Sequence, residues 1–443
     1  MPNSTPEPAS QVRPSAGSDQ SEAVLNRNQS LWEQLGPGLV TGAADDDPSG
    51  IATYSQAGAA FGYGLLWTAI FTLPLMVGIQ MVCARIGRVS GCGIAANMRV
   101  HYGRWVLHGT IGLLLLANTI NIAADVGAMG AALKLLVGGP AQLYAVLFGT
   151  VSLLLQVFVP FPRYAPFLKA LTLALFAYVG TVFIVRVPWT AVLYRTVIPG
   201  ASFKPDYVVA LVAVFGTTIS PYLFFWQASQ EVEEQRSSPS EQPLKLAPEQ
   251  AERNLRRIRT DTYTGMAFSN LVSYFIILTA AVTLHAHGLT NVATSSDAAL
   301  ALRPIAGPYA FYLFAAGIVG TGLLAVPVLA GSAAYAVAEA FDWRIGLGRR
   351  LMQARGFYAI LTVAILLGTA LNFTPVDPIK ALFWSAVING VIAVPLMVIV
   401  MLLCARADVM GDFTVKGGLR LLGWAATAIM AVAVIVMLAT WQG

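Results

Sequence analysis

Three consecutive aspartates precede Pro48 inside an otherwise apolar segment of the chain. Because proline disfavours helix in the residue before it and has no backbone donor, we expect a helix to stop near Asp47. The break would leave backbone carbonyl groups free beside the carboxylates, for instance that of Ala44. Carboxylate and carbonyl oxygens are the ligands of hard cations such as Mg, Ca or Mn, so this segment predicts a cation site. Asp45 and Asp46 have an alternative role, either facing water in a wide vestibule or capping the outer half-helix.

A second proline break occurs at Ser220-Pro221, within another apolar segment. The carbonyl group of Thr217 and the hydroxyl group of Ser220 would add oxygen ligands to a cation held at the first break. The alternative is a simple proline kink at which the hydroxyl groups bond back to the backbone, as is common in membrane helices. The matching break at Asp47-Pro48 favours the first interpretation, and Pro48 and Pro221 are the predicted helix breaks.

A further acidic position lies in a long apolar segment between the two breaks. Asn118, Asn121 and Asp125 are spaced so that they share one helix face. An acid inside a membrane span is by default functional, as a proton relay, a member of an ion site or a counter-ion. The alternative is that Asp125 pairs with a polar group of another helix and serves packing only. Asn389, in a later segment, is a candidate for an extra ligand or for a hydrogen bond between helices.

The elements that position these residues follow from the composition, which is that of a polytopic membrane protein. Of the 443 residues, 56% are hydrophobic and only 11% are charged, and the mean hydropathy is +0.67. Soluble domains carry about 25% charged residues. A span needs ~20 apolar residues, so we expect an all-α integral membrane protein with about eleven transmembrane helices. The predicted spans are 36–60 (broken), 64–84, 105–137, 140–161, 165–186, 207–231 (broken), 262–285, 308–338, 356–373, 379–404 and 419–440.

Other features of the sequence exclude several classes of protein. Residues 1–30 lack an apolar run, so we expect a disordered cytoplasmic tail and no cleavable signal peptide. Cys83, Cys92 and Cys404 have no metal-site spacing and are interpreted as inert small residues. Nucleotide loops, zinc spacings and nucleophile elbows are absent, so the sequence indicates neither an enzyme nor a cofactor. The net charge of +5 is better explained by basic loops at a membrane than by nucleic-acid binding.

The distribution of basic residues predicts the orientation of the chain. With the N-terminus in the cytoplasm, 21 of the 27 Lys and Arg residues fall in inside segments. An inverted orientation would reverse this ratio, and the same count places the C-terminus outside. The basic loops suit the cytoplasmic leaflet of a cell membrane, inner or plasma, around a multi-pass protein.

The two halves of the chain show the same order of elements. Spans one to five and six to ten each begin with a broken helix, which is the layout of a five-plus-five inverted repeat. The segment 231–259 carries charges of both signs and is predicted to be a solvated loop between the halves. Broken helices at corresponding places indicate a transporter's binding site, and the aspartates predict a positive cargo or coupling ion. We predict one transporter domain, 31–443, with a first repeat at 36–200, a second repeat at 205–405 and an additional helix at 415–443.

Several motifs resemble those of the NRAMP family of proton-coupled divalent-metal transporters, which have a LeuT-like fold. Residues 47–50 read Asp-Pro-Ser-Gly where the family has Asp-Pro-Gly-Asn, and residues 220–222 read Ser-Pro-Tyr where it has Met-Pro-His. The resemblance covers nearly the whole membrane region. It implies that Asp47 binds metal and that the carbonyl group of Ala44 is a further ligand. Other similar stretches are 56–59, 62–67 and 124–126.

The sequence departs from the family pattern at positions that matter for the ion. The family's asparagine ligand is replaced by Gly50, which has no side chain, and its methionine thioether by Ser220. Because a thioether favours transition metals over Mg and Ca, its loss predicts a harder cation or one that stays hydrated. Some relatives that lack the methionine carry Mg, and this chain resembles them in that respect. Tyr222 replaces the family's histidine and Ile122 its third-span aspartate, so the proton route is incomplete.

The sequence thus predicts a transporter that imports a divalent cation by alternating access, with Mg slightly ahead of Mn. Two other functions stay open. One is a cation- or proton-coupled carrier of a small organic solute, such as an amino acid or amine, on the same fold. The other is a membrane protein that binds or senses its ligand without moving it. Apart from the ion and the lipid bilayer, we expect no nucleic acid and no obligatory protein partner. The predicted site is Asp47, Ala44, Thr217, Ser220 and Asn389 for the metal or substrate, with Asp125 and Asp46 for a coupled proton or ion.

Overall fold

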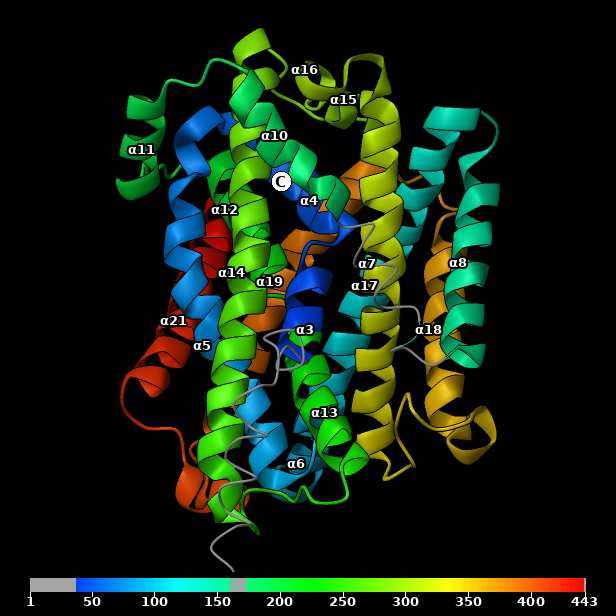
Figure 1. Cartoon of the computed structure of the whole chain (residues 1–443), viewed down its shortest axis with the longest axis vertical. Coiled ribbons are helices and arrows are strands. Elements are labelled where there is room, and N and C mark those ends of the chain that lie inside the picture. Colours follow the sequence, from blue (N-terminus) through cyan, green and yellow to red (C-terminus); the bar gives the residue numbers. More distant parts are fainter. Residues whose placement is uncertain (1–36, 160–162, 164–172, 442–443) are drawn as a thin grey trace, which may run out of the picture.

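A computed structural model describes residues 37–159, 163 and 173–441 of the chain (Figure 1). Within these residues the structure is helical and contains no strand. The predicted tail at 1–30 and the first part of the fifth predicted span lie outside the described residues. The all-α character that the hydropathy pattern predicts is therefore confirmed for the part of the chain that can be described.

The helices match the predicted membrane spans. Eight of the described helices or helix pairs are long and apolar enough to cross a membrane. The other three predicted spans are the broken first one and two shorter apolar helices, Leu173–Ile184 and Arg355–Leu371. The predicted architecture of a polytopic membrane protein is confirmed.

The first span is broken where the sequence predicts it. α3 (Pro37–Asp45) ends just before the proline, and α4 (Pro48–Phe61) begins with it. Asp47 is the N-cap of α4, with extended backbone angles of φ −72° and ψ 170°. A proline at the first helical position loses no hydrogen bond, because that N–H would be unpaired in any helix. Pro48 therefore both interrupts the span after α3 and begins α4.

The second break has the same backbone construction. α12 (Pro205–Thr218) ends before Ser220, and α13 (Pro221–Ser237) begins with the proline. Ser220 is extended, with φ −76° and ψ 129°. Both predicted helix breaks are thus present, and both lie near the centre of the molecule in Figure 1.

The first half contains six further described helices, one of which is unusually long. The longest has 34 residues, more than the ~20 that a bilayer requires, so it tilts or extends beyond the membrane. These helices are α5 (Trp67–Ser90), α6 (Ile94–His101), α7 (Arg104–Val137), α8 (Ala141–Phe158), α10 (Phe176–Ile184) and α11 (Trp189–Val197), with 3-10 turns at Gly62–Leu65 and Leu173–Leu175.

The remaining helices of the second half follow a similar plan, with short helices between the long ones. Two of the long helices contain a proline in their interior, Pro327 and Pro395. The helices are α14 (Ala251–Thr283), α15 (Ser295–Leu300), α16 (Arg303–Ala306), α17 (Ala310–Ala340), α18 (Arg355–Leu371), α19 (Pro378–Leu403), α20 (Ala407–Met410) and α21 (Gly417–Thr440), with 3-10 turns at Pro248–Gln250, His285–His287, Gly307–Tyr309, Leu351–Gln353 and Gly411–Phe413.

Long helices of the second half pack against the broken helices and against α7 (Figure 1). α14 runs along α3 and α4, α19 packs on α12, and α17 packs on α7. Glycines allow the closest approaches. A Cβ at Gly42 would lie 2.2 Å from the carbonyl oxygen of Gly265, and one at Gly216 would lie 2.0 Å from that of Ala386. Because any larger residue would push the helices apart, these glycines set how closely α14 and α19 approach the breaks.

The solvated loop predicted at 231–259 is much shorter than expected, so that prediction was wrong for most of its length. α13 and α14 extend into it and leave only 238–250 as their connection. The charges pair with one another: Arg257 contacts Glu231 at 2.5 Å and Glu234 at 2.9 Å. Charges of both signs in the sequence therefore indicated two helix ends that neutralise each other, rather than a segment surrounded by water.

Two reciprocal contacts hold α13 against α17. Glu339 of α17 accepts a hydrogen bond from Ser229 of α13 at 3.0 Å, and Glu233 of α13 accepts one from Tyr335 of α17 at 2.5 Å. Glu339 also accepts the backbone N–H of Ala96, near the start of α6, at 3.2 Å. Each long helix thus contributes one carboxylate and one hydroxyl group. The four side chains fix the position of α13, and with it the residues of its first turn.

Candidate metal-ion site

Asp47 lies between the two halves of the first broken helix and caps α4. Its Oδ1 accepts a hydrogen bond from the backbone N–H of Gly50 at 2.7 Å, and the residue is only 2% exposed. Aspartate is a preferred N-cap, and the positive end of the helix dipole stabilises its negative charge. One carboxylate oxygen therefore anchors the half-helix, and Oδ2 is left for another partner.

A residue from the second break forms a hydrogen bond with a free carbonyl group at the end of α3. The phenol group of Tyr222 donates a hydrogen bond to the carbonyl oxygen of Ala44 at 2.9 Å and lies 3.4 Å from Oδ2 of Asp47. Tyr222 and Ala44 are both fully buried. Sequence reasoning named Ala44 and Asp47 as ligands but treated Tyr222 only as a replacement within a motif. Its place directly after Pro221, at the start of a half-helix, is the signal that could have identified it.

At the second break, a side chain of the same span bonds the free backbone carbonyl groups. The hydroxyl group of Ser220 donates to the carbonyl oxygens of Gly216, at 3.0 Å, and of Thr217, at 2.8 Å. This is the back-bonded arrangement that the sequence left open as the alternative. Each carbonyl oxygen keeps a second lone pair. The roles of Thr217 and Ser220 as ion ligands stay predictions.

Asp45 and Asp46 lie against α14 and do not face water. They are 1% and 2% exposed, and the hydroxyl group of Ser269 lies 2.7 Å from Oδ2 of Asp45 and 3.1 Å from Oδ1 of Asp46. The second oxygen of each carboxylate has no hydrogen-bond partner among the described residues. A hydroxyl group has one proton, so the two carboxylates share a single donor.

Asp125 of α7 approaches the first break from the side. It is fully buried, and neither carboxylate oxygen forms a hydrogen bond of normal geometry within the described residues. The backbone N–H of Ser49 and the carboxylate of Asp47 are close enough to interact with it electrostatically. The sequence placed Asp125 on a polar helix face, and the fold turns that position toward the start of α4. Its role in ion coupling is still a prediction.

The two asparagines on the same face of α7 have protein partners. Asn121 and Asn389 form a reciprocal pair, with Nδ2 to Oδ1 distances of 2.8 Å and 3.2 Å. Asn118 donates to the carbonyl oxygen of Leu329 and to the hydroxyl group of Ser332 in α17. Asn389 thus links α19 to α7 in this structure, and its role as an extra ion ligand stays a prediction.

The space beside Gly50 is occupied by neighbouring side chains. A Cβ at this position would lie 3.2 Å from Oγ1 of Thr217 and 3.3 Å from the ring of Tyr54. Tyr54 in turn forms a hydrogen bond with Thr218 at 3.0 Å. The two breaks therefore pack directly on each other at Gly50, and a larger residue fits only if these neighbours move.

The four buried aspartates, Asp45, Asp46, Asp47 and Asp125, form a group of like charges. None of them takes part in the ion pairs found among the described residues. In the same part of the chain, no three His, Cys, Asp or Glu side chains converge as metal ligands. Buried carboxylates without a cationic partner are costly. The arrangement suits an added cation, which would complete its ligands with carbonyl oxygens or water.

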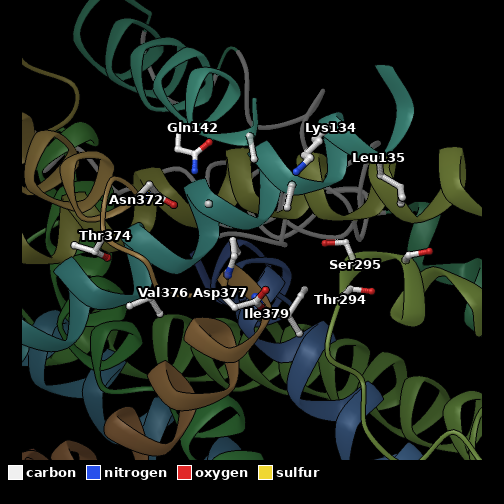
Figure 2. A pocket seen from close by; sticks show the side chains of 15 residues that line it. Lys134, Leu135, Gln142, Thr294, Ser295, Asn372, Thr374, Val376, Asp377 and Ile379 are labelled. Atoms are coloured by element: carbon white, nitrogen blue, oxygen red, sulfur yellow. The ribbon is translucent and has the colours of Figure 1, made fainter. Parts of the chain in front are cut away.

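A cavity of about 580 Å³ lies between the end of α7, the start of α8, the loop before α15 and the start of α19. Figure 2 shows that Lys134, Ser295 and Asp377 reach it from three different segments. Gly127 also lines the cavity, two residues beyond Asp125 along α7. The cavity therefore reaches α7 one half-turn from Asp125, which does not line it.

Comparison with known sequences finds one matching family and relatives that share the same name. The family described as natural resistance-associated macrophage protein-like matches residues 38–440. The divalent metal cation transporter MntH of Deinococcus radiodurans is 28% identical over 410 residues, which cover 89% of this chain and 87% of that protein. The protein of the same name from Chromohalobacter salexigens is 30% identical over 333 residues, which cover 70% of this chain and 72% of that protein.

Two solved structures have the same fold. The manganese transporter of Eremococcus coleocola, in complex with an aromatic bis-isothiourea substituted compound, superimposes with a TM-score of 0.70 at 19% identity, over 97% of this chain and 90% of that chain. Mhp1, a nucleobase-cation-symport-1 family transporter, superimposes with a TM-score of 0.54 at 15% identity, over 92% and 94%. The LeuT-like fold is thereby confirmed. Because the family match spans nearly the whole chain, this multi-pass membrane protein belongs to the natural resistance-associated macrophage protein-like family.

Proposed function

We propose that this protein moves a divalent metal cation across the cell membrane by alternating access around its two helix breaks. The observation that carries the proposal is the pair of buried carboxylates, Asp47 and Asp125, which interact with each other and have no cationic partner among the described residues. A dication would neutralise both. The names of the relatives, which are divalent metal cation transporters, support the same cargo and a transporter rather than an enzyme.

In this proposal Asp47 supplies the charge that holds the ion. Ala44 offers a carbonyl oxygen at the end of α3, directly or through a water molecule, and Thr217 and Ser220 offer oxygen atoms at the end of α12 and the start of α13. Oxygen ligands from two half-helices suit alternating access, because each half can move with one side of the protein. Asn389 would join only if its pair with Asn121 opened.

Among divalent cations, we infer that Mg²⁺ is the leading cargo and Mn²⁺ the second. The candidate ligands are all oxygen atoms, which suit Mg, Ca and Mn. Ser220 places a hydroxyl group where the family has a soft thioether, which removes the group that favours transition metals. The solved relative is a manganese transporter, which supports Mn²⁺.

For the direction and coupling of transport, we propose import with the N-terminus inside. The orientation rests on the excess of basic residues in the predicted inside segments. Asp125 and Asp46 are the candidates for a coupled proton or ion, because both are buried with an unpaired carboxylate oxygen. Ile122, in place of an acid, argues against a complete proton relay on α7.

The organic-solute carrier that the sequence left open is less favoured. A carrier of amino acids or amines on this fold would also use Asp47, so loss of uptake in an Asp47 variant does not distinguish the two cargoes. The names of the sequence relatives favour metal. Competition of uptake by free amino acids or amines would restore this alternative.

Ion flux in proteoliposomes tests the proposal. Fluorescent reporters for Mg²⁺ and Mn²⁺ would be followed at fixed membrane potential, with the internal pH recorded in parallel. Mg²⁺ entry without acidification is the expected result. Mn²⁺ entry with acidification would return the chain to ordinary proton-coupled transport. Flux of neither ion, from folded and oriented protein, would contradict the metal cargo.

A further inference from the structure

We propose that Tyr222 determines the ion specificity of the site by keeping the carbonyl group of Ala44 away from direct contact with the ion. This inference rests on the proposed function of divalent cation transport. The phenol group lies between the two oxygen atoms best placed to bind a cation, 2.9 Å from the carbonyl oxygen of Ala44 and 3.4 Å from Oδ2 of Asp47.

The hydrogen-bond inventory of a phenol explains the effect. Tyr222 has one proton to donate, and the shorter of its two contacts assigns that proton to Ala44. The bonded carbonyl oxygen points its electron density at the phenol proton. The phenol group takes one lone pair of the Ala44 carbonyl oxygen and also contacts Oδ2 of Asp47, so a bare cation that bridged these two oxygen atoms would have to displace it.

Tyr222 is not free to leave. It is fully buried and stands second in α13, directly after the proline that fixes the start of the helix. α13 is anchored to α17 by the reciprocal contacts of Ser229 with Glu339 and of Glu233 with Tyr335. The phenol oxygen therefore stays at the break as long as α13 keeps this position.

A cation that cannot displace Tyr222 is held by Asp47 and by water. This arrangement favours Mg²⁺, which dehydrates reluctantly and in proteins usually keeps several waters while bound through one or two carboxylates. It disfavours ions that gain more from direct carbonyl ligands, such as Ca²⁺, which takes six to eight oxygen ligands in flexible geometry. Tyr222 thereby selects an ion by how firmly it holds its water, whereas the thioether of the family selects by the softness of the metal.

The test compares two phenol-to-phenyl variants at the same break. Tyr222→Phe removes the hydroxyl group that bonds Ala44, whereas Tyr54→Phe removes one whose hydrogen-bond partner, Thr218, is not a candidate ion ligand. In proteoliposomes, uptake of Mg²⁺, Mn²⁺ and Ca²⁺ would be measured on each protein as KM and maximal rate. The KM for Mn²⁺ and Ca²⁺ relative to Mg²⁺ is expected to fall about tenfold in Tyr222→Phe, because the freed carbonyl group lacks any other partner. The same ratio should change less than about twofold in Tyr54→Phe, which loses a hydrogen bond of ordinary strength.

The outcomes separate this inference from the proposed function. Wild-type protein that moves none of the three ions would refute the proposed function. Transport with an unchanged ratio in Tyr222→Phe, or an equal loss of all ions, would overturn the role of Tyr222 alone. Should Tyr222→Phe fail to fold, the wild-type protein still decides: Mn²⁺ bound to it should retain several waters, counted by electron nuclear double resonance. A bound Mn²⁺ stripped of water would overturn the inference.

Discussion

The two breaks have the same backbone construction but satisfy their polar groups in opposite ways. At each, an extended residue precedes a proline that opens the next half-helix. Ser220 bonds back to the carbonyl groups of its own span, over three and four residues. At the first break, the carbonyl group of Ala44 depends on Tyr222, which is 178 positions away in the sequence. The carbonyl groups of the second break are therefore bonded within their own span, whereas the carbonyl group of Ala44 at the first break is bonded only through the rest of the fold.

The breaks also differ in charge. The first carries three buried carboxylates, and Asp45 and Asp46 share the single hydroxyl group of Ser269. The second carries hydroxyl groups and no charged side chain at its break. A neutral break whose carbonyl groups are all hydrogen-bonded has a low free-energy cost in an apolar environment. A break with buried carboxylates that lack partners has a high cost, and a bound cation lowers it. In the proposed function, the first break would therefore attract the ion and the second would shape its surroundings.

The largest effect should follow from removing the charge of Asp47. In Asp47→Asn the amide oxygen can still accept the N–H of Gly50, so the cap of α4 survives while the charge is lost. We expect uptake to fall about 100-fold or more, since taking away one partner of a buried ionic contact costs about 3–5 kcal/mol. Initial rates in proteoliposomes at matched protein density measure the change.

A matched control exists in the same chain. Asp377 also stands before a proline and caps a long helix, α19, by accepting the N–H groups of Ile379 and Lys380. Asp377→Asn changes the same chemical group in the same local motif, at an exposed residue that lines the cavity and belongs to neither break. Uptake should stay within about twofold of the wild type, as expected for an exposed position. A comparable loss in both variants would mean that helix capping, and not charge at the break, explains the effect of Asp47→Asn.

The next largest effect concerns the second carboxylate. In Asp125→Asn, the KM for the divalent cation should rise about tenfold, because the ion loses its weaker and more distant charge partner, worth about 1.4 kcal/mol. The maximal rate should change less than the KM. Titration of uptake against ion concentration measures both. An unchanged KM would restrict Asp125 to a structural or coupling role and would leave the first break as the whole source of charge.

A smaller effect is expected where the two breaks touch. In Gly50→Ala, the new methyl group would meet Thr217 and the ring of Tyr54 at 3.2–3.3 Å. We expect the free energy of unfolding to fall by about 1 kcal/mol, in the range of overpacking, and uptake to fall about threefold. Thermal unfolding in detergent measures the stability. In the control Gly112→Ala, the Cβ meets nothing within 4 Å, so that α7 should be as stable or more stable. Equal losses in both would refute tight packing at Gly50.

The smallest effect should come from Ser220→Ala. The hydroxyl group bonds to carbonyl groups of its own span, and losing such a hydrogen bond costs about 1 kcal/mol. Uptake should therefore fall less than about threefold if these bonds are present in every state of the transport cycle. Concentration-dependent uptake assays give the answer. A loss as large as that of Asp47→Asn would abolish the difference between the breaks and make Ser220 an ion ligand as important as Asp47.

Much of the architecture could be predicted because it depends on local chemistry. Hydropathy identified the membrane spans, and the prolines at 48 and 221 located both breaks. Helix ends in polar segments were harder. α14 begins at Ala251, well before the predicted span at 262, because Arg257 is neutralised by acids on α13. That pairing depends on a neighbouring helix, and no spacing within one helix reveals it.

The sequence by itself determined that this is a helical membrane protein with two proline breaks, an acid-rich first break and a further acid on a polar face of α7. These features follow from side-chain hydrophobicity and from the missing N–H of proline, which act wherever the residues occur. The tertiary structure alone decided which groups meet: Tyr222 with Ala44, Ser269 with two aspartates, and Asn121 with Asn389. These partners lie far apart along the chain. A buried polar group must find its partner in whichever helix packs beside it, and only the packed structure specifies that neighbour.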